Sequence, residues 1–522
     1  MTTPRSLPRL ARPLLLILPF LAAPFLGCGG SPEPAADGGG VSTDGDAPAS
    51  TPASIELFEE SLDLEDGGTR SYDRGVLKAP LRRDQPSGPS VDVEFFRFRR
   101  DAEASPDTPP LVILHGGPGY EGLAPRLADT GYFEDRLTRY TRITDVIVPG
   151  QRGFGSSTPT PCEPSRQLTR DEAQDPPTRS RAIQDAARAC RQKWRDAGLD
   201  PFGFNVLEAS ADVADIVRLL GYGKVQLRGV SFGSHWGMSV IRHHPEIVDR
   251  AVLASLEGPD HTYDMPSAVL ATLERIAAAA EASPALADRI PEGGFLEAYR
   301  RLIERAEKEP IAVEVEDPVE GSPVEISLGP GDLRQMLAGT RGLVFFRFRM
   351  PRWPLVLLDM LEGDLTEAAD RHLWNLMSTD FEDAAYLQYD CGSGLSAARG
   401  EVLRRDPAAS TLGPTWSRLD NFCRGWDGDL GEAFRSPFTT EVPTVLVQGT
   451  WDIGTPYENA LELRPYFANH HFVTVEGGSH GAIREALEDS PAFREAMDRW
   501  LATGDGAKIP ETVELTPVKW RG

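Results

Sequence analysis

Val225-Gln226-Leu227-Arg228-Gly229-Val230-Ser231-Phe232-Gly233 is the stretch of this chain that decides its fold. Its first residues predict a strand, and the apolar pattern from Phe232 to His244, ended by Pro245, predicts a helix directly after it. A serine between a strand and a helix needs a sharp turn, and the glycines on either side are required because side chains there would collide with neighbouring elements. Such a turn exposes the hydroxyl of Ser231, which we therefore predict to be a nucleophile.

The segments around this stretch alternate between strand and helix patterns. Val213, Ile216, Val217 and Leu220 recur at helical spacing, and Asn205 is the expected cap of that helix. Short apolar or alternating runs predict strands at 91–98, 111–114, 145–148, 251–254, 444–447 and 471–475. A final helix is expected at 491–501. This alternation predicts an α/β fold with a mainly parallel sheet covered by helices on both faces.

The pattern changes between residues 259 and 437. Helices are expected at 268–282, 295–307 and 353–376, with a β-hairpin formed by 311–315 and 324–328. We interpret this stretch as a mostly helical cap domain inserted over the sheet. We expect the first part of the core at 54–258, the cap at 259–437, the second part of the core at 438–505 and a C-terminal tail at 506–522.

Residues 1–27 have the pattern of an export signal. Three arginines precede an apolar segment at 13–26, which is too short to span a bilayer comfortably. The segment ends at Cys28 and resembles a bacterial lipoprotein signal, in which the cysteine is lipidated and becomes the mature N-terminus. Residues 28–53 are rich in Gly, Ala, Pro, Ser and Asp and are expected to be a flexible tether. Plain secretion without a lipid is the alternative.

Composition and charge narrow the class of protein. With 522 residues, 40% of them hydrophobic, the chain can bury a large core and form a second domain. Its net charge of −25 disfavours nucleic acid and anionic membrane surfaces as partners. The expected contact with a membrane is therefore the lipid on Cys28 alone. We expect no metal and no cofactor.

The cysteines agree with export. Besides Cys28 the chain has four, an even number that suits an oxidising compartment. Three pairings are open, and proximity along the chain favours Cys162 with Cys190 and Cys391 with Cys423. The alternative is a set of buried free thiols.

A serine hydroxyl becomes a good nucleophile only when a base takes its proton. Of the nine histidines, His480 alone follows a predicted strand inside a Gly-rich loop, and it is the candidate base. Asp452, just past another predicted strand, is the candidate for orienting and stabilising the imidazolium. Asp452 as a turn cap is the alternative, with Asp427 or Asp429 supplying the acid. His235, on the helix after the nucleophile, is interpreted as a packing residue.

The loop His115-Gly116-Gly117-Pro118-Gly119 directly follows a predicted strand. Such a loop can direct backbone N–H groups at an oxyanion that develops during reaction. The N–H groups of Gly117 and Phe232 are the expected pair, since proline has none. An ordinary Gly-Pro turn is the alternative interpretation.

Taken together, these motifs resemble the prolyl aminopeptidase (proline iminopeptidase) and tripeptidyl aminopeptidase family of serine α/β-hydrolases. The chain order Ser…Asp…His is the order of that fold. The resemblance runs from about Arg74 to Leu501. The features that carry it, several of them closer to the tripeptidyl branch, are His115–Gly119, Gln151–Ser157, Gly229–Gly233, Trp353-Pro354, Asp390-Cys391, Cys423–Trp426, Asp452 with Thr455-Pro456, and His480.

The resemblance implies an α/β-hydrolase fold with an inserted cap. It implies that Ser231, Asp452 and His480 form a catalytic triad and that Gly117 and Phe232 form an oxyanion hole. It also implies acyl-enzyme chemistry that releases an N-terminal residue or short peptide. The expected substrates are peptides with a free N-terminus.

An aminopeptidase needs a carboxylate that pairs with the substrate ammonium group. Glu257, Asp260 and Glu362 are the candidates, and Glu257 has the best position because it lies where the cap begins. The alternative for each is a solvated acid on an acidic protein.

Two other functions remain open at this point. The same triad could act on small esters, as in a carboxylesterase, because one fold hosts many chemistries. A lipoprotein that uses the hydrolase fold only for binding is a third interpretation.

Overall fold

The computed structural model describes residues 53–520 with internal gaps. The gaps are 65–66, 120–136, 156, 158–167, 170–171, 173–174, 318–320, 339–352, 367–368, 370–383, 414–421 and 427. The predicted signal, Cys28 and the tether up to residue 52 therefore lie outside the described residues, as does Cys162. Within the described part, no helix is both long enough and apolar enough to cross a membrane.

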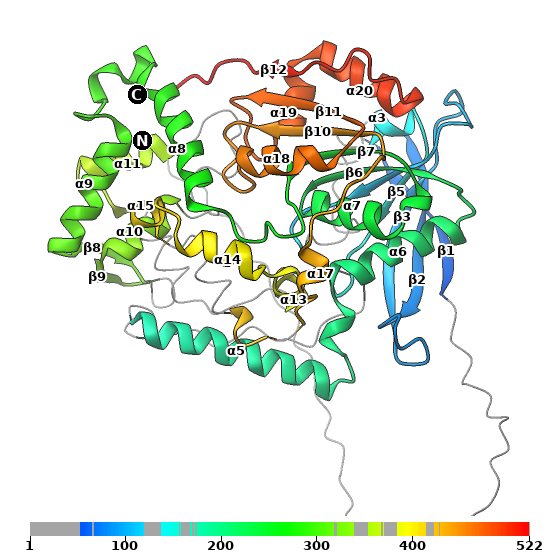
Figure 1. The fold of residues 1–522 in the computed structure, drawn as a ribbon, viewed down its shortest axis with the longest axis horizontal. Coiled ribbons are helices and arrows are strands. Elements are labelled where there is room, and N and C mark those ends of the chain that lie inside the picture. The colour runs from blue at the N-terminus through cyan, green and yellow to red at the C-terminus, as the bar shows by residue number, and fades with distance from the viewer. Residues whose placement is uncertain are drawn as a thin grey trace, which may run out of the picture. The chain divides into compact units, whose positions relative to one another are not determined.

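A ten-stranded sheet forms the centre of the described chain (Figure 1). Its strand order is β1-β2-β3-β5-β4-β6-β7-β10-β11-β12. The strands span Ser54–Asp63, Thr69–Pro80, Ser90–Phe98, Leu111–Leu114 and Val146–Pro149 (β1 to β5), Val225–Ser231 and Val248–Leu256 (β6 and β7), and Thr444–Gly449, His470–Glu476 and Thr512–Glu514 (β10 to β12). From β5 to β12 every pair of neighbours is parallel, which confirms the predicted fold class.

The sheet is extended at both edges, and of the added strands the sequence predicted only β3, as the run at 91–98. β1, β2 and β3 pair antiparallel, and β3 joins the parallel part by pairing antiparallel with β5. At the other edge β12 pairs in parallel with β11, with Val513 opposite Val475. Residues 506–522, set apart in the sequence as a tail, thus contribute a strand to the sheet.

Successive residues of one strand pack on opposite faces of the sheet. In β4, Val112 and Leu114 belong to one buried cluster, whereas Leu111 and Ile113 belong to another. Helices cover both faces, as the alternation predicted. The first face carries α5 (Pro176–Asp196), α6 (Val206–Leu219), α7 (Phe232–His243) and α18 (Tyr457–Leu463), and the second α3 (Thr138–Thr141), α19 (Ala482–Asp489) and α20 (Pro491–Thr503).

A separate hydrophobic core holds most of the residues between β7 and β10 together. Its large side chains include Trp353, Phe295 and Tyr299, and each of them is almost fully buried. The elements of this region are α8 (Pro266–Glu281), α9 (Phe295–Lys308), β8 (Ile311–Glu316), β9 (Pro323–Leu328), α10 (Pro330–Ala338), α11 (Trp353–Leu361), α13 (Ala384–Ser393), α14 (Ala397–Arg404), α15 (Ala409–Leu412) and α17 (Glu432–Arg435). In Figure 1 α8 to α11 lie to the left of the sheet, whereas α13 and α17 lie below β10 and β11 and pack on the first of the two sheet clusters.

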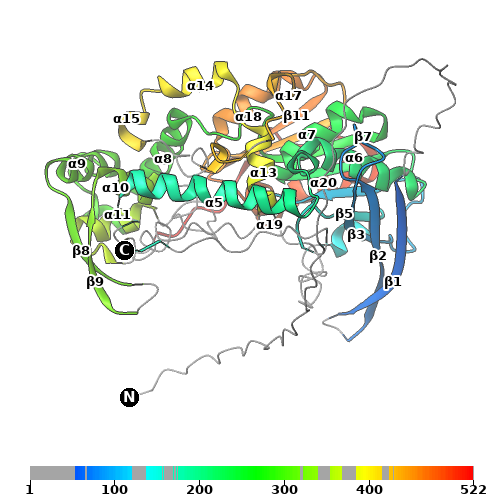
Figure 2. The ribbon, with the colours of Figure 1, turned by 90° about the horizontal axis from the view of Figure 1, so that it is seen from below.

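Two local features differ from the sequence-based expectation in this region. The helix expected over 353–376 ends at Leu361, because Gly363 has φ +101° and the N–H of Asp364 turns back to the carbonyl of Asp359. The helix α5 was not predicted. It runs from the region of α9–α11 toward the sheet (Figure 2), and its Trp194 meets Trp426 edge-on at 5.3 Å between ring centroids.

A fully buried ion pair joins the loop after β5 to helix α6. The Nε and Nη2 atoms of Arg152 donate to the Asp212 carboxylate at 2.5 and 2.7 Å. Burial alone would raise the pKa of Asp212, but the charges of Arg152 and Arg83 hold it below its usual value. Arg152 also donates to three backbone carbonyls, those of Pro80, Leu81 and Gly203. One guanidinium therefore connects the loop of the Gln-Arg-Gly motif to the end of β2, to α6 and to the turn before it.

Replacing Arg152 should destabilise the fold strongly. Arg152→Met leaves the buried Asp212 carboxylate with Arg83 as its remaining cation and removes the donor of three carbonyls, and we expect the free energy of unfolding to fall by about 3 kcal/mol. Urea unfolding measures this. The control is Arg218→Met, which breaks the half-exposed pair with Glu246 and should cost less than about 1 kcal/mol. Equal losses in the two variants would contradict the assignment.

Candidate active site

The turn that carries Ser231 has a strained backbone. Ser231 ends β6, immediately precedes α7 and has φ +61°, a region that side-chain-bearing residues rarely adopt. A Cβ atom on Gly229 would lie 2.0 Å from the carbonyl oxygen of Gly233, and one on Gly233 would lie 2.1 Å from that of Leu114. The two glycines therefore allow the strand, the helix and β4 to approach at backbone distance. The Ser231 side chain stays partly exposed.

The loop at 115–119 lies against this turn. A Cβ on Gly116 would be 3.3 Å from Cβ and 3.7 Å from Oγ of Ser231. Gln151 fixes the loop from behind, since its Oε1 accepts from the N–H of Gly119 at 2.9 Å and its Nε2 donates to the carbonyl of His115 at 3.1 Å. The loop of the predicted oxyanion hole and the predicted nucleophile are thus neighbours. Gln151 was part of a quoted motif, but its role was not foreseen.

Asp452 and His480 form a buried hydrogen-bonded pair. His480 Nδ1 lies 2.9 and 3.1 Å from the two carboxylate oxygens of Asp452. The carboxylate also accepts from the N–H groups of Gly454 and Thr455, from the Thr455 hydroxyl at 2.8 Å and from Gln448 Nε2 at 3.3 Å. Burial would raise the pKa of Asp452, but the charge of His480 and these donors hold it below its usual value. Asp452 is therefore kept ionised next to the ring.

The sheet brings these loops to one edge. Ser231 ends β6, and Asp452 and His480 follow β10 and β11; the carboxyl ends of these strands lie at the same edge because the strands are parallel. Ser255, at the end of the intervening strand β7, donates from its hydroxyl to the carbonyl of His480 at 2.9 Å. The hydroxyl of Ser234 donates to the carbonyl of Ser231 at 2.7 Å.

The three acids proposed for the substrate ammonium group have different environments. Asp260 accepts from the N–H and the hydroxyl of Ser396. Glu362 is exposed and pairs with Arg289. Glu257 alone lies beside the turn of the nucleophile, since its own N–H donates to the Ser234 hydroxyl at 2.9 Å.

Two carboxyl groups that the sequence did not single out as acids accompany Glu257. Burial, and then the negative fields of Asp390 and Asp264, raise the pKa of Glu257 well above its usual value. Burial also raises the pKa of Asp264 to about 8, against the hydrogen bond that Asn459 donates to it at 3.0 Å. Glu257 and Asp264, from the segment after β7, are therefore buried acids, and the charges of Asp264 and of Asp390 on α13 act on Glu257. No spacing pattern could have shown this, since α13 lies more than a hundred residues along the chain.

The alternative acids of the sequence analysis have other places. Asp429 receives Nη1 of Arg435 at 2.6 Å and the N–H of Gly431 at 2.8 Å, so its carboxylate belongs to the cap. Asp427 lies outside the described residues.

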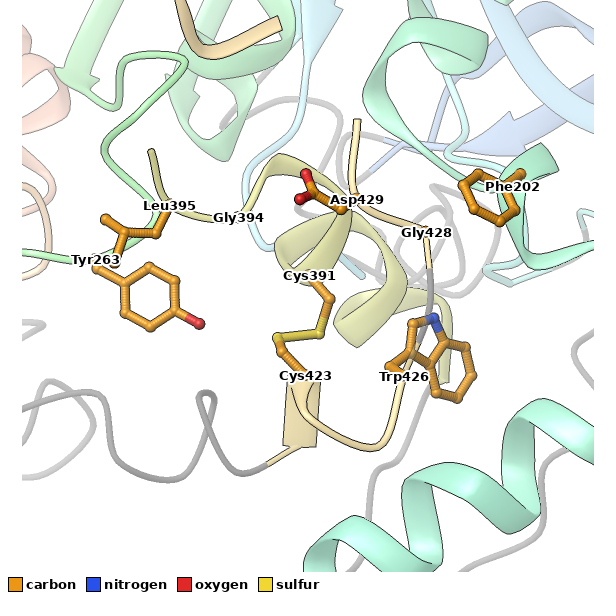
Figure 3. A pocket seen from close by; sticks show the side chains of 9 residues that line it. All are labelled: Phe202, Tyr263, Cys391, Gly394, Leu395, Cys423, Trp426, Gly428 and Asp429. Atoms are coloured by element: carbon orange, nitrogen blue, oxygen red, sulfur yellow. A yellow bond between two sulfur atoms is a disulfide. The ribbon is translucent and has the colours of Figure 1, made fainter. Parts of the chain in front are cut away.

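The structure contains the disulfide Cys391–Cys423, one of the two pairs that proximity favoured. Cys190 is also disulfide-bonded. The Cys391–Cys423 bridge lies on a cavity of about 540 Å³, with Tyr263 on one side and Trp426 on the other (Figure 3). The bridge therefore fixes the end of α13, where Asp390 lies, to the segment that carries Trp426.

Among the described residues, no group of histidine, cysteine, aspartate and glutamate side chains is arranged to hold a metal ion. A model of the α/β hydrolase fold matches residues 109–486, which span the turn, the loop at 115–119, Asp452 and His480. This chain belongs to the α/β hydrolase fold family. It is accordingly a hydrolase.

Similar proteins within this hydrolase family include aminopeptidases. The chain is 23% identical to the tripeptidyl aminopeptidase of Streptomyces lividans over 499 residues, which cover 89% of this chain and 89% of that protein. It is 22% identical to the tripeptidyl aminopeptidase of Streptomyces coelicolor over 459 residues, 82% of this chain and 81% of that one. Proline iminopeptidase of Neisseria meningitidis is 26% identical over 163 residues, 31% of this chain and 37% of the other. The resemblance to this peptidase family is thereby confirmed.

The glycine contacts at the turn give a direct test. In Gly229→Ala the added methyl group meets backbone atoms at 2.0 Å, so we expect the free energy of unfolding to fall by about 3 kcal/mol or more. In the control, Gly223→Ala, the methyl group meets nothing within 4 Å, and stability should change little. Thermal unfolding of the two purified variants measures the difference. A Gly229→Ala variant as stable as Gly223→Ala would show that the turn is not tightly packed.

Proposed function

We propose that this hydrolase is an exported serine exopeptidase that removes an N-terminal residue or a short N-terminal peptide. The observation that carries the proposal is the buried Asp452–His480 pair at the same sheet edge as the strained Ser231 turn. The similarity to two tripeptidyl aminopeptidases over most of the chain supports the peptide substrate.

The hydrogen bonds assign a role to each nitrogen of the base. The Asp452 carboxylate is ionised and can only accept, so Nδ1 of His480 carries the ring proton. Nε2 is then the unprotonated nitrogen that acts as the base. It takes the proton of the Ser231 hydroxyl as Oγ bonds to the substrate carbonyl carbon, and Asp452 stabilises the resulting imidazolium.

The remaining steps follow from the same groups. The carbonyl oxygen becomes an oxyanion, and the N–H groups of Gly117 and Phe232 donate to it. His480 then returns the proton to the leaving amine as the C–N bond breaks, which leaves an acyl group on Ser231. Water, deprotonated by His480, attacks this ester and releases the N-terminal product.

The acids around Glu257 supply the preference for a free N-terminus in this proposal. An ammonium group entering this space would pair with a carboxylate that water solvates poorly, and such a pair is strong. The pKa of Glu257 is raised first by burial and then by the crowding of the negative charges of Asp390 and Asp264. A cation relieves that crowding, so binding of the ammonium group and ionisation of Glu257 favour each other.

The disulfide is consistent with an oxidising compartment outside the cytoplasm. We further propose that the chain is exported through its signal at 1–27 and held at the bacterial cell envelope by a lipid on Cys28. The acidic tether at 28–53 would then separate the hydrolase from the membrane surface.

Removing the nucleophile should abolish turnover without unfolding the protein. We expect Ser231→Ala to lower kcat/KM for aminoacyl and tripeptidyl chromogenic amides by at least about 10⁴-fold, with an unchanged melting temperature. The matched control is Ser410→Ala, an exposed cap serine. A fluorophosphonate probe should label the wild type and the control but not Ser231→Ala. Full activity of Ser231→Ala would remove Ser231 from the mechanism, and a folded wild type that stays unlabelled would favour a binding protein.

The role of Glu257 is tested with free and blocked substrates. The wild type should cleave a free-amine peptide amide much faster than its N-acetylated form, and Glu257→Gln should reduce that preference by about 30-fold. The control is Glu362→Gln at the surface. The preference should also decline as the pH falls through the raised pKa of Glu257, because the protonated acid no longer attracts the ammonium group, and again above the amine pKa of about 8.

Equal rates on the free and the acetylated amide in the wild type would refute the exopeptidase proposal. In that case, fast cleavage of p-nitrophenyl esters would identify the protein as an esterase with the same triad.

A further inference from the structure

A buried histidine on the nucleophile helix joins three segments of the chain. His235 lies one helical turn after Ser231 on α7 and is 2% exposed. Its Nδ1 is 3.0 Å from the carbonyl oxygen of Gly258, and its Nε2 is 2.9 Å from the hydroxyl of Ser393. The ring thus contacts the loop after β7 on one side and the end of α13 on the other. The sequence analysis interpreted His235 as a packing residue, and these two polar contacts revise that interpretation.

The hydrogen bonds have a fixed direction. A carbonyl oxygen can only accept, so Nδ1 of His235 carries the proton and donates to Gly258. Nε2 must then accept, and the Ser393 hydroxyl donates to it. Burial lowers the pKa of His235 to about 4, so the ring stays neutral over the ordinary pH range and this order persists.

Both partners of the ring are next to acids of the proposed ammonium site. Gly258 directly follows Glu257, and Ser393 is three residues after Asp390 on the same helix. The carbonyl of Ser393 is held separately by Nη1 of Arg435 at 2.9 Å. The His235 ring therefore connects the helix that Ser231 begins to two segments, each of which carries one carboxylate.

Packing alone does not account for a histidine here. The ring faces Phe232 and Phe434 at centroid distances of 5.6 and 5.7 Å, so a phenylalanine would satisfy these neighbours. Burying two ring nitrogens is costly unless both are hydrogen-bonded, and both are. The two ring nitrogens thus hold the segments that carry Gly258 and Ser393 in fixed positions relative to α7.

We propose that His235 is a positioning residue that sets Glu257 and Asp390 at the distance from Ser231 that a free N-terminus requires. The proposal rests on the exopeptidase function proposed above and adds the structural basis of its preference for an amine. It separates two parts of the site: the triad, which His235 does not touch, and the ammonium site, which it holds in place.

The test compares an amide with a free amine and an ester without one. In His235→Phe we expect kcat/KM for a free-amine peptide amide to fall about tenfold, mainly through KM, because the carboxylates shift. The kcat/KM for p-nitrophenyl acetate, which has no amine, should change less than twofold. His471→Phe is the control, since His471 packs edge-on against Trp500 in the other hydrophobic cluster.

Further variants distinguish positioning from loss of packing. Ser393→Ala removes one of the two bonds and should reproduce the selective loss, and the double variant with His235→Phe should be no worse than His235→Phe alone. His235→Gln, whose amide oxygen can accept from Ser393, should recover part of the preference for the amine.

Each outcome decides the matter. An equal fall of kcat/KM for the amide and the ester would mean that His235 positions the nucleophile instead. No fall for either substrate would mean that His235 is only a packing residue. If the variant does not fold, Ser393→Ala carries the test, and a normal amide-to-ester ratio in it would overturn the proposal. A wild type that ignores acetylation of the amine would instead refute the exopeptidase function on which this inference rests.

Discussion

The close approach of three backbone segments at the Ser231 turn is the constraint on which the rest of the site depends. Gly229 and Gly233 let β6, α7 and the end of β4 lie nearer to one another than any side chain would allow. The close packing of these neighbours holds Ser231 at its strained φ. The loop at 115–119, fixed by Gln151, then lies directly against the serine. The chemistry of the site is thus built on main-chain geometry before any charged group contributes.

Around this turn, the charged groups are arranged in two sets with opposite electrostatics. The Asp452 carboxylate has many donors, which keep it ionised beside His480. Glu257 and Asp264 have few donors, and burial favours their neutral forms. The first set is a complete hydrogen-bonded network, whereas in the second burial outweighs the positive charge of Arg399 that acts on Asp264, so a further positive charge there would be stabilising. Such a combination of an ionised acid and poorly hydrated acids suits an enzyme whose substrate carries a positive charge.

The parallel part of the sheet, the Ser231 turn and the Asp452–His480 pair could be predicted because each is encoded locally, as an apolar run or a Gly-rich loop. β1 was missed because most of its residues are polar and exposed, with no apolar face to detect. The helix α5 has buried residues at helical spacing, at Ile183, Ala187, Cys190 and Trp194, but its polar composition obscured them. The sequence could not predict that Asp264 and Asp390 accompany Glu257, because only tertiary packing buries these acids.

The last strand of the sheet has a consequence for self-association. β12, formed by Thr512–Glu514, pairs with Thr474–Glu476 of β11, just before the loop that carries His480. It covers backbone N–H and C=O groups of β11 that would otherwise form an open sheet edge. β12 therefore keeps this part of β11 from pairing with a strand of another molecule.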